Sequence, residues 1–237
     1  MKKITPEEFT AEVQAVCGGS LQSAVLYGSA AAGDRASKGS DYNILLVMND
    51  LSAPVLRALS KPVSNWERAG NPPPMLFTRK RLFEAADIFP IEFLDMKDAR
   101  RILFGDDIIA EMNVDPANLR LQVERELRVA LIQLRRNYLA AAGGNHRRLA
   151  ALMTGSFSGI MSVFHAALRL YETPAPLEKI AALEKLNAHV PLKMDGLKKI
   201  RELKNRTVKI KMVDVERLFE EYLKSIELLV DAVDKLV

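Results

Sequence analysis

The sequence predicts an α/β domain followed by an all-α helical bundle, and two observations carry this prediction. In the first half, apolar runs of strand length at residues 21–27 and 42–48 alternate with helical patterns. After about Glu111 the strand patterns end, and Leu119, Val123 and Leu127 begin a long run of apolar residues at helical spacing. We therefore place the α/β domain at residues 1–112 and the helical bundle at residues 113–237.

The elements of the first domain follow from local patterns. Thr5-Pro6-Glu7-Glu8 is a capping box with proline at the first helical position, which predicts a helix from Pro6 to Val16. Gly18-Gly19 ends this helix. Further helices are expected at about residues 54–69 and 79–86, where Ser52 and Thr78 are the capping residues. Strands are expected at residues 21–27, 42–48, 75–77 and 88–96, with an edge strand at residues 101–104.

The second domain is expected to contain helices only. The first is a long amphipathic helix over about residues 119–138, which the Gly143-Gly144-Asn145 segment breaks. The others are expected at about residues 146–171, 176–188, 192–205 and 213–236.

Composition excludes several classes of protein. Apolar residues make up 49% of the 237 residues and charged residues 27%, which is ordinary for a globular protein. A single cysteine, Cys17, excludes an internal disulfide and fits a reducing cytoplasm. We recognise neither a signal peptide nor an apolar run approaching the ~20 residues that span a bilayer. The expectation is a cytoplasmic protein with no membrane partner.

One group of polar residues in the first domain suggests chemistry. A predicted strand leads into Gly28-Ser29, where glycine lets the backbone approach a ligand and exposed amides favour phosphate. The next strand begins with Asp41 and Asn43, which share one face because strand side chains alternate. Glu92 is a lone carboxylate in a third apolar stretch, and a buried charge needs a partner or a metal. We expect Asp41, Asn43 and Glu92 to converge beside the Gly28-Ser29 turn.

This pattern resembles the nucleotidyltransferase superfamily, including kanamycin nucleotidyltransferase-like and polymerase-beta-like domains, and a group of bacterial nucleotidyltransferase-like proteins. The family signature is Gly-Ser at a strand end, a glycine four residues after the serine, Asp-x-Asp on the next strand and a third acid on a neighbouring strand. Gly28, Ser29, Gly33, Asp41 and Glu92 match it, over roughly Leu21 to Gly105. The resemblance implies a nucleotidyltransferase domain with a mixed sheet, often joined to a helical domain.

The resemblance also implies roles for individual residues. The nucleotide, a nucleoside triphosphate such as ATP, would be bound by Gly28, Ser29, Gly33 and Ser40. Magnesium would be bound by Asp41, Asn43 and Glu92, and the catalytic residues would be Asp41 and Glu92. The family's activity is transfer of a nucleoside monophosphate to a hydroxyl of an acceptor, here a small molecule or a protein.

This sequence departs from the family signature at the second acid, where Asn43 replaces an aspartate. Asparagine offers one neutral oxygen, so it is a poor bridge between two magnesium ions. Two readings stay open: a magnesium-dependent nucleotidyltransferase, and a regulatory protein that binds nucleotide without turnover. Asp95 lies three residues after Glu92, on the opposite face of the expected strand, so we favour Glu92 as the site residue.

The remaining candidates are weaker. Residues 193–211 contain eight basic side chains against Asp195 and Glu202, and residues 111–237 carry 21 basic and 16 acidic residues. A solvated helical face explains this stretch better than nucleic-acid binding, because aromatic residues for base stacking are missing. His146, His165 and His189 have no metal-ligand spacing. Asp106-Asp107 suggest a turn and a helix cap. A homodimer is left open.

Overall fold

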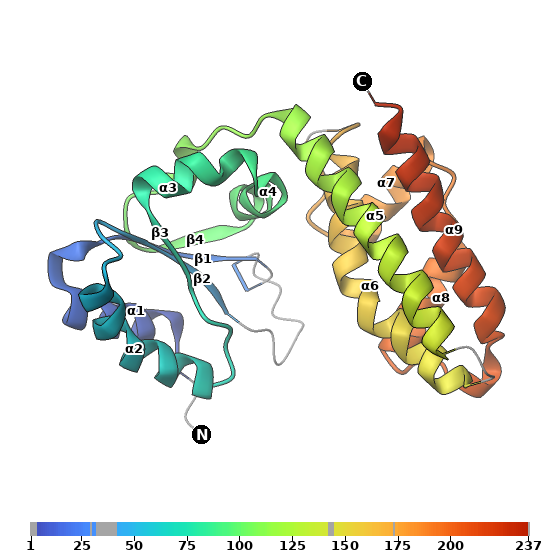
Figure 1. Cartoon of the computed structure of the whole chain (residues 1–237), viewed down its shortest axis with the longest axis horizontal. Coiled ribbons are helices and arrows are strands. Elements are labelled where there is room, and N and C mark those ends of the chain that lie inside the picture. Colours follow the sequence, from blue (N-terminus) through green and yellow to red (C-terminus); the bar gives the residue numbers. More distant parts are fainter. Residues whose placement is uncertain (1–3, 29, 32–41, 142–144, 173, 237) are drawn as a thin grey trace. The chain divides into compact units, whose positions relative to one another are not determined.

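The computed structural model describes residues 4–28, 30–31, 42–141, 145–172 and 174–236 (Figure 1). The chain divides into two compact units, Met1–Asp115 and Pro116–Val237. The boundary lies three residues after the one we placed from sequence. Each unit is described by itself.

The first unit is built on a four-stranded mixed sheet, in the order β3-β2-β1-β4. β1 pairs antiparallel with β2 and with β4, whereas β2 and β3 are parallel. The α/β class with a mixed sheet is confirmed, and so are the strands around residues 21–27, 42–48 and 75–77 and the edge strand after residue 100. The strands are β1 Leu21–Tyr27, β2 Asn43–Met48, β3 Met75–Thr78 and β4 Arg100–Gly105.

Alternation along β1 and β2 produces two apolar faces, each covered by helices (Figure 1). Leu26, Ile44 and Leu46 pack on one side with α1 Pro6–Cys17 and α2 Ala53–Arg68. Val25, Leu45 and Val47 pack on the other side, which carries α3 and α4. The remaining elements of this unit are α3 Arg79–Glu84, α4 Pro90–Asp98, η1 Gly18–Ser20, η2 Ala85–Asp87 and η3 Ile108–Glu111.

The predicted helix starts of this unit are largely confirmed. Thr5 accepts from the Glu8 amide while the Glu8 side chain accepts from the Thr5 amide, which completes the capping box of α1. Thr78 caps α3 by accepting from the Arg81 amide. At α2, Ser52 is the N-cap residue but makes no capping hydrogen bond, because its hydroxyl donates to Asp50 instead.

The prediction of a strand at residues 88–96 is wrong, because most of this segment lies in helix α4. Pro90 lies in its first turn, where the fixed φ suits a helix and no N–H is required. Glu92 is also in the first turn, where the positive end of the helix dipole favours a carboxylate. A short apolar run does not by itself distinguish a strand from a helix. Glu92 therefore lies on a helix that covers the sheet.

The second unit contains five α-helices within its described residues, as the sequence predicts, and α6 packs against the other four. By length and composition α6 could cross a membrane, contrary to the sequence expectation, and half of that apolar window is buried inside the protein. This burial suits the core helix of a bundle. The elements are α5 Pro116–Ala141, α6 His146–Leu168, α7 Lys179–His189, α8 Met194–Lys204, α9 Val215–Asp234 and the short η4 Ile210–Met212.

Candidate functional site

The end of β1 forms a tight turn at Gly28. Its φ is +79°, a conformation that side chains with a Cβ rarely adopt. The Gly28 amide donates to the Ala99 carbonyl at 3.0 Å, and the Gly28 carbonyl accepts from the Ala31 amide at 2.9 Å. These bonds fix the backbone where β1 ends, beside the start of β4. Ser29, Gly33, Ser40 and Asp41, which the sequence places in this site, lie outside the described residues.

Asn43 lies directly beside this turn. It is the first residue of β2 and pairs with Tyr27, the last residue of β1. A Cβ added to Gly28 would lie 3.4 Å from Asn43 Nδ2, so the asparagine amide packs against the glycine. Asn43 shares its strand face with Leu45 and Val47, the face on which α4 packs. Gly28 and Asn43 therefore meet as expected from the sequence.

Glu92 approaches the same end of β1 from helix α4. Burial first, and the negative charge of Glu92 second, raise the pKa of Tyr27 to about 12. The Glu92 carboxylate is therefore near the Tyr27 phenol. The strand argument that separated Glu92 from Asp95 is wrong, because residues three apart share one face of a helix.

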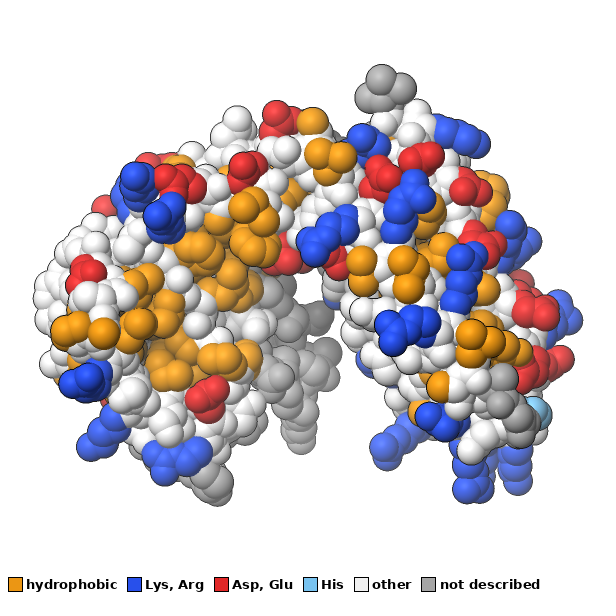
Figure 2. Space-filling view, in the orientation of Figure 1, with side chains coloured by type: hydrophobic (Ala, Val, Ile, Leu, Met, Phe, Trp, Pro, Cys, Tyr) orange, Lys and Arg blue, Asp and Glu red, His pale blue; other side chains and the backbone are white. Residues whose placement is uncertain are grey.

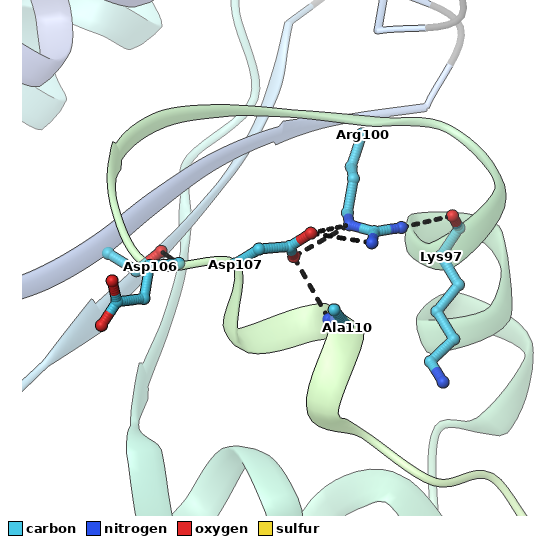
Figure 3. Close-up of polar contacts among 6 residues, drawn as sticks. Lys97, Arg100, Asp106, Asp107 and Ala110 are labelled. Atoms are coloured by element: carbon cyan, nitrogen blue, oxygen red, sulfur yellow. Dashed lines mark hydrogen bonds and ion pairs between the residues drawn. The ribbon is translucent and has the colours of Figure 1, made fainter.

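Arg100 and Asp107 form a polar network next to this turn (Figure 3) that the sequence did not reveal. Arg100 pairs with Tyr27 across β1 and β4. Its Nε donates to Asp107 Oδ1 at 2.9 Å, its Nη2 donates to Asp107 Oδ2 at 2.8 Å, and its Nη1 donates to the Lys97 carbonyl. The bond to Lys97 connects β4 to the last turn of α4, and the bonds to Asp107 connect β4 to the residue that precedes η3.

Asp107 also caps η3, as its position in the sequence suggests. Its Oδ1 accepts from the Ala110 amide at 3.2 Å. The hydrogen bond from Arg100 is the largest cause that lowers the pKa of Asp107, and the Ala110 amide adds to it. Asp107 is therefore held as a carboxylate, whereas the neighbouring Asp106 side chain points away from Arg100 (Figure 3).

The described residues supply only part of the oxygen ligands that a magnesium site needs. No group of three His, Cys, Asp or Glu side chains with metal-binding geometry occurs in the part of the chain that the structure describes. The described candidates are the Asn43 amide and the Glu92 carboxylate. Both offer hard oxygens, which suit magnesium, but they carry only one negative charge between them. Each could contribute one ligand to a magnesium site, and the two do not by themselves fit a bridge between two ions.

The second unit contains the other candidate residues. On α8, Lys198 pairs with Glu184 and Lys199 with Glu202, as expected for a solvated helical face. Buried His165 bonds to the Pro176 carbonyl through Nε2 at 2.8 Å, and His189 stacks on Tyr171. A groove of about 500 Å³ between α8 and α9 has lining side chains of both charges, so its charge favours neither anions nor cations.

Comparisons with known proteins give likenesses of fold among solved structures. No protein-family model and no curated protein matches the sequence. Among solved structures, the chain is similar to spectinomycin adenyltransferase AAD(9) from Enterococcus faecialis, determined with ATP and spectinomycin. The identity is 11% and the TM-score 0.45, with 98% of this chain and 100% of that chain covered. At these values no property of that protein is transferred to this chain.

Proposed function

We propose that this chain binds a magnesium–nucleoside triphosphate at the Gly28 turn and transfers the nucleoside monophosphate to a hydroxyl group of a small molecule or a protein. The contact between Gly28 and Asn43 carries the proposal. It brings Gly28 and the first residue of β2 together at one end of the sheet. The sequence motif supplies the phosphate-binding turn and Asp41, two residues before Asn43.

Each residue would contribute a separate function. Gly28 leaves room for phosphate oxygens near the backbone, because it has no side chain. Asp41 and Asn43 would hold magnesium, which when bound neutralises charge on the triphosphate. Glu92 would accept the proton of the acceptor hydroxyl, a role that a positioned carboxylate can take. The Arg100–Asp107 network would keep α4, and with it Glu92, in place.

A second candidate function is nucleotide binding without turnover. Two observations favour it: Asn43 is neutral where the family motif has an acid, and Glu92 lies on a helix instead of a strand. Neither observation opposes binding of phosphate at the Gly28 turn. The two functions therefore share the nucleotide site and differ in catalysis alone.

Calorimetry followed by a pyrophosphate-release assay tests both candidates. Each nucleoside triphosphate would be titrated into the chain with and without magnesium. We expect one nucleotide to bind, magnesium to strengthen its binding, and Asp41→Asn to weaken that magnesium effect. Asp50→Asn, an exposed change at the far end of β2, is the matched control. Binding with pyrophosphate release supports the enzyme, binding without release supports the second function, and absence of binding refutes both.

A further inference from the structure

Helix α5 carries a second apolar stripe, opposite the one that it buries. Leu119, Val123, Leu127 and Leu134 form its buried stripe. On its outer side Leu121 is 55% exposed, Ile132 56% and Leu139 73%, with Val129 at 38%. At about 100° per residue, these four fall within a sector of roughly 80° that lies opposite the buried stripe. A bundle helix needs one apolar stripe to pack, so the second one needs another explanation.

Arginines interleave with the second stripe. Arg125, Arg128, Arg135 and Arg136 lie in or beside the same sector, and Figure 2 shows hydrophobic and basic side chains alternating over α5. Arg128 and Arg135 are bound to Asp234 and Glu227 of α9. Arg125 makes only a 3.8 Å contact with Glu126, and Arg136 has no carboxylate partner among the described residues. Within the described helix, every charged residue in the exposed class is an arginine.

We propose that this surface, formed by Leu121, Arg125, Val129, Ile132, Arg136 and Leu139, docks an acidic amphipathic helix of a partner protein. A helix that lies along α5 would place apolar side chains on the aliphatic residues and carboxylates beside Arg125 and Arg136. The stripe from Leu121 to Leu139 is about 27 Å long at 1.5 Å per residue, so a partner helix of about five turns would cover it.

The arginines of this surface favour an acidic helix over a second copy of the chain as its partner. If two α5 helices packed antiparallel, Leu121 would face Leu139 and Val129 would face Ile132. That register places Arg125 of each copy against Arg135 and Arg136 of the other. A parallel pair would place each arginine against itself. Like charges in contact oppose association, so the apolar match alone does not favour a dimer through this surface.

Neighbouring charges also disfavour flat anionic partners. Glu227 and Asp234 of α9 lie beside α5, held by Arg135 and Arg128. A membrane surface or a nucleic-acid duplex wide enough to cover α5 would also approach these carboxylates. A single helix laid along the stripe would meet the aliphatic residues and the two available arginines.

The test uses the full chain and two labelled synthetic peptides. The acidic peptide is an amphipathic helix of about five turns, with leucine on one face and glutamate on its flanks. Its twin carries lysine at every glutamate. By fluorescence anisotropy we expect the acidic peptide to bind at least about tenfold more tightly than its twin, with an affinity that falls as salt rises.

Variants on and off the surface make the test specific. Ile132→Ser should weaken binding of the acidic peptide about tenfold, whereas Leu177→Ser, which changes an exposed leucine outside α5, should not. Arg125→Glu combined with Arg136→Glu should reverse the preference and select the lysine twin. All of these positions are exposed, so circular dichroism and thermal melting should match the parent chain.

Four results would overturn the proposal. The first is equal binding of both peptides, or binding of neither. The second is self-association in sedimentation that Ile132→Ser abolishes, which would assign the surface to a second copy. The third is binding to phosphatidylglycerol vesicles that the same change removes. The fourth is RNA binding that the double arginine variant removes.

Discussion

Asn43 determines how much negative charge the Gly28 end of the sheet can offer to a metal. Asparagine and aspartate have nearly the same shape, so Asn43→Asp should disturb the packing against Gly28 little. It adds a carboxylate two residues from Asp41, and without metal the two should repel and raise one pKa. With magnesium, we expect nucleotide binding to tighten about tenfold, measured by calorimetry, and pyrophosphate release to increase.

The same substitution distinguishes three possibilities. Tighter binding with still no turnover would favour the regulatory function. Asp41→Asn should abolish release in an enzyme of the family type. Slower release in Asn43→Asp would show that the amide is a needed ligand and that our view of Asn43 as a weakened position is wrong.

Two features favour glycine at position 28: its backbone φ is positive, and the Asn43 side chain packs against it. In Gly28→Ala the alanine backbone must adopt a φ of +79°. The new Cβ must also lie 3.4 Å from Asn43 Nδ2. The left-handed conformation costs an alanine about 1–2 kcal/mol, so we expect a loss of this size in the free energy of unfolding, together with weaker nucleotide binding. Urea denaturation and calorimetry measure the two effects.

The matched control for Gly28→Ala lies in the second unit. Gly155 is an exposed residue within helix α6, and a Cβ there would meet no atom within 4 Å. Gly155→Ala should therefore increase the free energy of unfolding by about 0.5–1 kcal/mol, because alanine is the better helix former. If both alanine variants behaved alike, the Gly28 turn would not have the strained geometry described here.

Asp107 makes the stability of the first unit depend on pH. Because its folded pKa is lowered, its contribution is complete above the ordinary value of 3.8 and is lost as pH falls through the folded pKa. Asp107→Asn keeps a capping oxygen but removes the charge. We expect it to lower the free energy of unfolding by about 1 kcal/mol at pH 7. That difference should shrink below about pH 4.

Urea denaturation at several pH values measures this loss, and Asp106→Asn is its control. The Asp106 side chain is exposed and points away from Arg100 (Figure 3), while its backbone carbonyl accepts from Ser23. Asp106→Asn should change stability little at any pH. An equal loss of stability in both variants would show that the effect does not come from the ion pair between Arg100 and Asp107.

At the scale of elements, strands buried on both faces could be predicted and α4 could not. β2 is apolar from Ile44 to Met48 and β1 from Ala24 to Tyr27, so both their existence and their alternation follow from sequence. In α4, Ile91, Phe93 and Met96 are buried, and this spacing matches neither a clean strand nor a clean helical stripe. Which pattern forms is decided by the surface that the segment covers, and that surface comes from distant residues.

The same limit applies to the candidate site. The meeting of Gly28 and Asn43 could be predicted, because two adjacent strands place their ends together. The Arg100–Asp107 bond could not, since it depends on β4 pairing with β1 and on the turn that follows β4. Sequence spacing indicates which residues share a strand face, but it does not give the order of strands in the sheet.

The position of α4 can be tested through Tyr27. If Glu92 lies near the phenol, Glu92→Gln should lower the Tyr27 pKa from about 12, although burial should keep it above the ordinary value of 10.0. Asp95→Asn, on the same helix, should change it less because Glu92 is the charged group that acts on Tyr27. Nuclear magnetic resonance of labelled tyrosine at rising pH would follow this one residue among the five tyrosines. If Glu92→Gln left the Tyr27 pKa unchanged, Glu92 would not belong to the candidate site.

At the scale of the whole molecule, each unit has its own core. The first unit buries apolar residues on both faces of its sheet. The cluster on the face that carries α3 and α4 includes Ile108, Ile109 and Met112, and Val114 packs against it. The second unit is centred on α6. Because the candidate nucleotide site is formed by β1, β2 and α4, it lies wholly within the first unit.

The last prediction follows from this division. A fragment of residues 1–115 should fold and bind nucleotide within about threefold of the full chain, since no residue of the candidate site lies beyond residue 115. A fragment of residues 1–112 keeps buried Met112 but loses Val114 from the cluster. It should therefore be less stable by about 1 kcal/mol. Thermal melting and calorimetry of both fragments, with residues 116–237 as the control that should not bind nucleotide, measure these differences. Nucleotide binding that needs the full chain would place part of the site on the helical unit, and the proposed function would then involve both units.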